Sequence, residues 1–194
     1  MPDHPLKLIV GLGNPGPNHD SNRHNAGVIF LHPLCKAYGG ALRGESKFFG
    51  EFTSINVDGN EIKLLFPTTF MNHSGKSVAA VCNFFKIEAK NILVAYDEID
   101  FDVGVTRLKE GGGHGGHNGV RDIINALNSQ KDFFRLRIGV GHPGHKSMVS
   151  NYVLSDPSRS EADVIMRDIE DAIRVIPKAT KGLWEEAIRL LHTD

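Results

Sequence analysis

The sequence predicts an α/β fold: a single domain over residues 1–194, built as a twisted mixed sheet with helices on both faces. Short runs rich in Val, Ile and Leu alternate with segments of helical periodicity. A chain of 194 residues with 40% hydrophobic content can bury one substantial core, and no repeat or linker divides it. Functional residues are therefore expected beyond the carboxyl ends of the strands, where such sheets bind ligands.

Short apolar or alternating runs predict six strands. They are Leu6–Leu12, Glu51–Val57, Glu61–Phe66, Ile92–Tyr96, Val105–Lys109 and Phe134–Val140. The turn residues Asp58-Gly59-Asn60 join the second and third of these strands into a β-hairpin. In the last strand Leu136, Ile138 and Val140 alternate with Arg135 and Arg137, which predicts one apolar and one basic face.

Helical spacing of apolar residues predicts five helices. The first three are Asn25–Tyr38, in which Pro33 implies a kink or a late start, His73–Lys86 and Asn118–Leu127. Ser158 and Glu161 have capping-box spacing before a long periodic run that Pro177 should end, and Leu183–Leu191 is a final short helix. The side chains expected to face inward from the second helix are Val78, Val81, Phe84 and Phe85.

The net charge of −1 argues against a protein that coats nucleic acid, including DNA, through a general basic surface. The charge is unevenly distributed. Residues 105–146 carry seven Lys and Arg against three acids, whereas residues 151–194 carry six against nine. A polyanionic partner is therefore expected to meet the middle third of the chain.

The sequence carries no sign of export or of a membrane anchor. Asp3 and His4 stand where a signal peptide would have basic residues, and no run approaches the ~18 apolar residues of a membrane helix. Cys35 and Cys82 lie in apolar segments without CxxC spacing, which suits buried free thiols. We expect a cytoplasmic monomer.

Three cofactor or nucleophile motifs fail on inspection. Gly11 to Gly16 formally satisfies GxGxxG, but Pro15 prevents a helix from starting there to receive a pyrophosphate. Gly75-Lys76-Ser77 resembles the end of a P-loop, yet Phe70 occupies the position of its first glycine. The sequence has no GxSxG motif for a serine hydrolase. None of these chemistries is predicted.

Two HxxH pairs leave metal-assisted hydrolysis open as an alternative. They are His114 with His117 and His142 with His145, and nearby acids could add oxygen ligands. Glycine and proline inside both pairs place them on loops, where this spacing does not by itself bring ligands together. We therefore expect no metal and no other cofactor.

A set of ordered segments is more specific than any of these motifs. They are Gly11-Leu-Gly-Asn-Pro-Gly16, Arg23-His-Asn-Ala-Gly27, Pro67-Thr-Thr-Phe-Met-Asn72, Ser74-Gly-Lys76, Asp97-Glu-Ile-Asp100, Gly111-Gly-Gly-His-Gly-Gly-His-Asn-Gly119 and Arg135-Leu-Arg-Ile-Gly-Val-Gly-His-Pro-Gly144. Their order and spacing, from about Leu8 to Leu154, resemble those of bacterial peptidyl-tRNA hydrolases.

The resemblance implies a catalytic set made of His24, Asp97 and Asn14. The general base of the family falls on His24, whose near-neutral pKa suits removal of a proton from water. Its carboxylate partner falls on Asp97, where it would hold one imidazole tautomer and favour the protonated ring. Asn14 falls where the family distinguishes N-blocked from free aminoacyl groups.

The resemblance also implies six substrate-binding positions. They are His19, Phe70, Asn72, Asn118, Lys109 and Arg137. An asparagine amide both donates and accepts, so it can pair with any peptide backbone. Phe70 would stack on the terminal base, while Lys109 and Arg137 would bind the 5′-phosphate of the tRNA. His19 stands where the family usually has tyrosine, and Asn22 and Tyr96 also depart from its pattern.

The implied activity is hydrolysis of the ester between a peptide, or an N-blocked aminoacyl group, and the 3′ end of tRNA. The implied partner is peptidyl-tRNA, bound through its acceptor stem and 3′ end. Two alternatives stay open: a metal-dependent hydrolase that uses the HxxH pairs, and a non-catalytic RNA-binding protein on the same fold.

Overall fold

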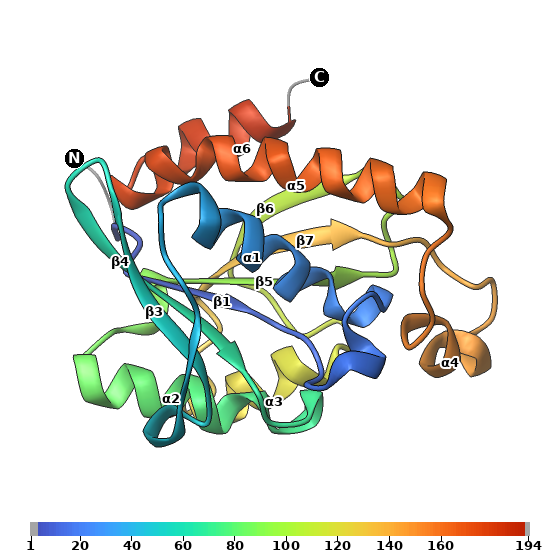
Figure 1. The fold of residues 1–194 in the computed structure, drawn as a ribbon, viewed down its shortest axis with the longest axis horizontal. Coiled ribbons are helices and arrows are strands. Elements are labelled where there is room, and N and C mark those ends of the chain that lie inside the picture. Colours follow the sequence, from blue (N-terminus) through green and yellow to red (C-terminus); the bar gives the residue numbers. More distant parts are fainter. Residues whose placement is uncertain (1–3, 193–194) are drawn as a thin grey trace.

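A computed structural model describes residues 4–192. Over these residues the chain forms a seven-stranded mixed sheet in the order β2-β3-β4-β1-β5-β7-β6 (Figure 1). The strands are β1 Leu8–Gly11, β2 Arg43–Glu45, β3 Gly50–Val57, β4 Asn60–Pro67, β5 Ile92–Glu98, β6 Thr106–Glu110 and β7 Phe134–Gly139. The central strands β4, β1, β5 and β7 are parallel, and β2, β3 and β6 add antiparallel edges.

Helices cover both faces of this sheet, which confirms the predicted fold class (Figure 1). The helices are α1 Ala26–Ala37, α2 Ser74–Phe85, α3 Asn118–Ala126, α4 Val149–Val153, α5 Arg159–Thr180 and α6 Trp184–His192. One core cluster lies between the sheet and α1, α5 and α6, and the other lies between the sheet and α2 and α3. Every helix within residues 4–192 is too short or too polar to cross a bilayer.

Short 3-10 helices connect several of these elements. They are η1 Pro17–His19, η2 Arg23–Asn25, η3 Ser46–Phe48, η4 Met71–His73, η5 Ala89–Asn91 and η6 Lys146–Met148. Two of them lead directly into longer helices: η2 into α1 and η4 into α2. Both junctions lie at the carboxyl ends of the central strands.

The start of α1 lies against the ends of β1 and β5, and this contact requires glycine. A Cβ on Gly27 would lie 2.1 Å from the carbonyl oxygen of Ala95 and 2.5 Å from the backbone nitrogen of Leu12. No side chain fits at those distances. Gly27 therefore lets η2 approach the end of β5, which brings His24 to Asp97.

Several local predictions are confirmed. The hairpin turn is Asp58-Gly59, with both residues at positive φ, as expected of a two-residue type I′ turn. Ser158 and Glu161 form a complete capping box at the start of α5. Cys35 and Cys82 are buried free thiols. The turn and the capping box depend on residues close together in sequence.

Two predictions about helices are wrong, and one of the two interpretations of Pro33 is excluded. Phe84 was expected to face inward, but it lies near the end of α2, packs edge-on against Phe48 and Phe85 and is 57% exposed. Pro33 was expected to cause a kink or a late start, and the late start is excluded because α1 begins at Ala26 and runs through the proline. Helix α5 likewise continues past Pro177 to Thr180, because its buried face outweighs one lost hydrogen bond.

Arg135 also differs from expectation. It was expected on the basic face of the last strand, and it is only 1% exposed. Its guanidinium donates to the carbonyl oxygens of Gly113 at 2.7 Å, Gly112 at 2.6 Å and Lys131 at 3.0 Å, and it stacks on Phe133. The buried charge is tolerated because backbone carbonyl oxygens accept its hydrogen bonds. Arg135 thus holds the glycine-rich loop, residues 111–116, against the sheet.

Candidate active site

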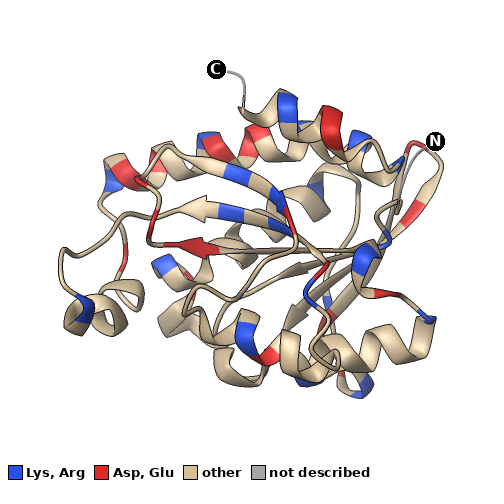
Figure 2. Cartoon of the chain, turned by 180° about the vertical axis from the view of Figure 1, so that it is seen from behind, with Lys and Arg blue, Asp and Glu red and all other residues tan. Residues whose placement is uncertain are grey.

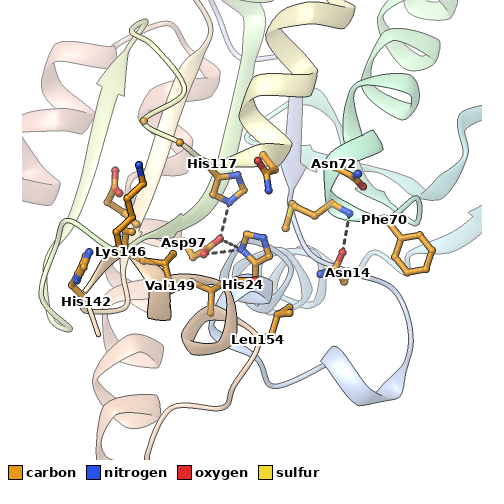
Figure 3. A pocket seen from close by; sticks show the side chains of 18 residues that line it. Asn14, His24, Phe70, Asn72, Asp97, His117, His142, Lys146, Val149 and Leu154 are labelled. Atoms are coloured by element: carbon orange, nitrogen blue, oxygen red, sulfur yellow. Dashed lines mark hydrogen bonds and ion pairs between the residues drawn. The ribbon is translucent and has the colours of Figure 1, made fainter. Parts of the chain in front are cut away.

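A cavity of about 710 Å³ opens beyond the carboxyl ends of β1 and β5, at the edge where ligands were expected (Figure 3). It is surrounded by η2, η4, the start of α3, the glycine-rich loop and α4. The lining residues are Asn14, His24, Phe70, Met71, Asn72, Asp97, Glu98, Ile99, Gly115, Gly116, His117, Asn118, His142, Lys146, Val149, Ser150, Val153 and Leu154. Polar groups gather at its base, and α4 supplies an apolar wall.

His24 and Asp97 meet at the base of the cavity (Figure 3). Nδ1 of His24 lies 2.8 Å from Oδ2 of Asp97 and 3.0 Å from Oδ1. The His24 side chain is 13% exposed and that of Asp97 only 2%. Because Nδ1–H of His24 donates a hydrogen bond to the carboxylate, Nε2 keeps its lone pair and can accept a proton from a group in the cavity.

The two groups shift each other's pKa. Burial disfavours the charged imidazolium of His24, but the charge of Asp97 and its hydrogen bond outweigh burial and raise the pKa of His24 above the ordinary histidine value. Burial alone would raise the pKa of Asp97, yet the attraction and hydrogen bonds of His24 and His117 hold that pKa well below its usual range. Asp97 is therefore a carboxylate at neutral pH.

His117 is a member of this site that sequence reasoning missed. Its Nε2 donates to Oδ1 of Asp97 at 2.8 Å, and its ring lies 4.9 Å from that of His24 between centroids. Its Nδ1 accepts from the backbone amides of Gly119 and Val120 at the start of α3. These amides fix the tautomer of His117. The sequence did hold one indication of this role. His117 stands directly before the helix that begins at Asn118, where a side chain can accept hydrogen bonds from the first amides of the helix.

The three ligand atoms of His24, Asp97 and His117 lie within 4.8 Å of one another, which is close enough to hold a metal ion. However, the amides of α3 occupy Nδ1 of His117, so its Nε2 carries a proton toward Asp97. A metal ion would have to displace this proton and that of His24 Nδ1. The observed contacts suit a carboxylate with two imidazole donors.

The two HxxH pairs do not converge on one point. His117 alone among their members belongs to the cluster with Asp97. His114, His142 and His145 each accept a loop amide at Nδ1, from Gly116, Gly144 and Ser147 respectively. Glycine and proline give these segments turns in which each histidine bonds its own loop. This arrangement favours a role for the pairs in loop structure.

The three asparagines all line the cavity. Asn14 follows β1, and its Oδ1 accepts the backbone amide of Met71 at 2.8 Å (Figure 3). Asn25 holds the backbone of Asn14 through two further hydrogen bonds of 2.9 and 3.0 Å. Because Oδ1 of Asn14 is occupied, its amide nitrogen is left as a donor for a bound group. Asn72 lies in η4, and Asn118 begins α3.

Comparison with known proteins agrees with this geometry. The chain matches the family profile of peptidyl-tRNA hydrolases over residues 8–194. It is 51% identical over 189 residues to the peptidyl-tRNA hydrolase of Pseudomonas paraeruginosa, covering 97% of each chain. The chain belongs to the peptidyl-tRNA hydrolase family. It is also 50% identical over 196 residues to the enzyme of Saccharophagus degradans, covering 99% of this chain and 98% of the other.

A crystal structure of peptidyl-tRNA hydrolase from Acinetobacter baumannii superposes with a TM-score of 0.94. The two sequences are 42% identical, and the match covers 97% of this chain and 95% of the other. The resemblance inferred from the ordered motifs is therefore confirmed. So are the α/β fold class and the activity of the family.

The positions expected to bind the substrate of this hydrolase family divide into two groups. Phe70 lies in the cavity wall and is 65% exposed, so its ring face is open to a ligand. His19 lies in η1, outside the lining, where its Nδ1 is 3.1 Å from the side-chain nitrogen of Asn22. His19 and Asn22, which both depart from the family pattern, therefore bond each other outside the cavity lining.

Lys109 lies on the edge strand β6 and Arg137 on its neighbour β7, where Figure 2 shows basic residues side by side. Their register places both side chains on one face of the sheet. Arg137 donates from Nε and Nη2 to Oε1 of Glu98 at 2.9 and 2.6 Å, and Glu98 lines the cavity. Lys109 and Arg137, called the basic strip below, therefore lie beside the cavity, and Glu98 contacts both Arg137 and the cavity.

Proposed function

We propose that this chain cleaves the ester of peptidyl-tRNA with His24 as general base and Asp97 as its carboxylate partner. The reaction follows from family membership. The mechanism rests on one observation: Asp97 binds Nδ1 of His24 at 2.8 Å, so Nε2 remains available to a water in the cavity. A positioned base contributes about 10²- to 10⁴-fold. That contribution is substantial for an ester, which is already an activated acyl group.

The asparagines complete a neutral binding surface around the base. Water attacks the ester carbonyl as His24 takes its proton, and negative charge develops on the carbonyl oxygen. The amide of Asn14, left free to donate, and those of Asn72 and Asn118 are placed to hold the peptide, the water and this oxygen. The arrangement needs no cofactor, and we expect the chain to act as a cytoplasmic monomer.

One assay separates this proposal from a non-catalytic RNA-binding role. The chain is incubated with N-acetylated aminoacyl-tRNA and with the same tRNA carrying an unblocked amino acid. Release of free tRNA from the blocked substrate, and much slower release from the unblocked one, is the expected result, because the free ammonium presents different hydrogen-bond partners to Asn14. Binding without release from either substrate would rule the hydrolase out.

Activity is expected to survive exhaustive treatment with EDTA. The ring nitrogens that could converge on a metal are bonded to Asp97, and the HxxH pairs bond their own loops. The measurement is the rate of cleavage of N-acetylated aminoacyl-tRNA before and after chelation and desalting. Loss of activity that a divalent ion restores would favour the metal-dependent alternative.

Contacts with the acceptor stem are proposed to center on Lys109 and Arg137. A guanidinium has five donors and Glu98 takes two of them, so a phosphate can join the pair. Replacing either residue by Ala should raise KM for tRNA substrates with a 5′-phosphate by about tenfold and hardly change KM without it. Because few phosphates are engaged, the salt dependence of binding should be shallow.

The matched control for this experiment is Arg174→Ala on α5, since Arg174 is exposed and lies outside the basic strip. KM is measured for wild type and the three variants, on both substrates and at two salt concentrations. Equal losses on both substrates would show that Lys109 and Arg137 support the fold or the general electrostatic field. A matching loss in Arg174→Ala would also assign the effect to net charge.

A further inference from the structure

Helix α4 forms a wall of the active-site cavity but lies to one side of the layered sheet (Figure 1). Val149, Ser150 and Val153 from this helix, with Leu154 after it, line the cavity. Figure 3 shows Val149 on the other side of His24 from Asn72. A five-residue helix is not stable by itself in water. Its position must therefore be set by contacts with the rest of the chain.

The side chain of Arg23 makes several of these contacts. Its Nη1 donates to the carbonyl oxygens of Tyr152 at 3.2 Å and Ser155 at 3.3 Å, and to Oγ of Ser155 at 2.6 Å. The guanidinium carbon lies 3.9 Å from the centre of the Tyr152 ring. Nη2 lies 3.5 Å from Oε1 of Glu161, in the first turn of α5. One guanidinium thus binds the end of α4, the linker after it and the start of α5.

These contacts are buried and specific to arginine. The Arg23 side chain is only 9% exposed, so its hydrogen bonds are stronger than they would be in open solvent. A lysine would keep the charge but could neither bond several acceptors as a planar fork nor stack flat on the Tyr152 ring. Nothing in the proposed mechanism uses Arg23, although it is the residue directly before His24.

We propose that Arg23 is a positioning residue that latches α4 to the turn carrying His24, so that the base and the apolar wall keep one fixed separation. The backbone amide of Arg23 also donates to the carbonyl oxygen of Ser155 at 3.1 Å, which ties η2 itself to the same linker. This inference rests on the proposed role of His24 and deepens it. It explains how Arg23, a residue outside the cavity lining, sets the position of the apolar wall relative to His24.

The Arg23 side chain has free space beside it. A second cavity of about 370 Å³ lies between residues 20–23, α1 and α5, and Arg23 contributes to its lining together with Ile29, Ile165 and Met166. The guanidinium is therefore held in its present position by its contacts with Tyr152, Ser155 and Glu161, and not by a lack of other space.

The test compares Arg23→Lys, Ser155→Ala and the control Arg174→Lys, which makes the same substitution at an exposed arginine of α5. Amide hydrogen exchange of the full chain reports opening of residues 149–154, and kcat and KM are measured with N-acetylated aminoacyl-tRNA. Arg23→Lys should speed exchange of these amides about tenfold and raise KM about tenfold. The kcat should change less than threefold, because His24 keeps its bond to Asp97.

Ser155→Ala removes one acceptor of Arg23 and the hydrogen bond from Oγ of Ser155 to the carbonyl oxygen of Tyr152, and it leaves the buried charge in place. It should therefore shift exchange and KM in the same direction by about threefold. The double variant should lose less than the two single changes added together, because both weaken the same group of contacts. Arg174→Lys should match wild type. If Arg23→Lys does not fold, Ser155→Ala carries the test alone.

Three outcomes would overturn the latch. They are faster exchange spread evenly through the central strands, faster exchange at α4 with unchanged KM, and a loss of kcat without a change in KM. The exchange measurement does not depend on catalysis, and His24→Ala should exchange like wild type at residues 149–154. If His24 proved not to be the base, the exchange of residues 149–154 would therefore still show whether Arg23 holds α4.

Discussion

Replacing His24 by Ala is expected to lower kcat for N-blocked aminoacyl-tRNA by at least ~10²-fold, because the group that accepts the proton of water is lost. KM should change little, since the asparagines, Phe70 and the basic strip remain. The fold should also remain, because Asp97 keeps its hydrogen bond from His117 and no buried carboxylate is left alone. The measurements are kcat, KM and the midpoint of thermal unfolding.

The matched control is His145→Ala. His145 belongs to an HxxH pair, bonds only within its own turn and does not line the cavity. The proposed mechanism predicts wild-type kcat for this variant, whereas a metal site built from the HxxH pairs predicts a loss comparable to that of His24→Ala. Near-wild-type turnover in His24→Ala, with the fold intact, would end the proposal that His24 is the base.

Elements with strong local signals could be predicted from the sequence. The Asp58-Gly59 turn, the capping box at Ser158 and the apolar runs of β1 and β5 each depend on neighbouring residues. Helix α4 could not be predicted, because Arg23 holds it from 129 residues away in the chain. The burial of Arg135 likewise depends on carbonyl oxygens of a distant loop.

The proposed catalytic residues were inferred from ordered motifs, whereas their mutual geometry could not be inferred in this way. The number of residues between His24 and Asp97 in the sequence does not determine how far apart they lie in space. Their 2.8 Å contact exists because Gly27 lets η2 approach β5. His117 was considered only as a metal ligand, since its bond to Asp97 requires the start of α3 to lie beside β5. The pairing of Arg137 with Glu98 also arises between neighbouring strands.

Replacing Asp97 by Asn is expected to lower kcat by about ten- to a hundredfold through a change of tautomer. His117 is fixed by the amides of α3 as a donor at Nε2, so the asparagine should turn its oxygen toward His117. Its amide nitrogen then faces Nδ1 of His24, which must accept. The proton of His24 is then favoured at Nε2, and only the minority of molecules with the proton at Nδ1 can take a proton from water. The loss is therefore smaller than that of His24→Ala, and the remaining activity still depends on His24.

The same substitution should move the pH profile in a direction that the structure determines. His24 acts as a base in its neutral form, so kcat/KM rises as pH passes the pKa of His24. In the wild type Asp97 raises this pKa against the effect of burial. Without the carboxylate charge, burial dominates and the pKa falls. The rising limb of the profile should therefore shift to lower pH in Asp97→Asn.

The profile of kcat/KM is measured for wild type, Asp97→Asn and the control Asp100→Asn, which removes an exposed carboxylate three residues further along the chain. Asp100→Asn should leave the limb in place, because Asp97 supplies both the charge and the hydrogen bond that raise the pKa of His24. A limb that stays in place in Asp97→Asn, or that moves equally in both variants, would show that Asp97 does not set the basicity of His24. In that case the 2.8 Å contact between them would serve to hold η2 against β5, and the group that titrates in the rate would have to be sought elsewhere in the cavity.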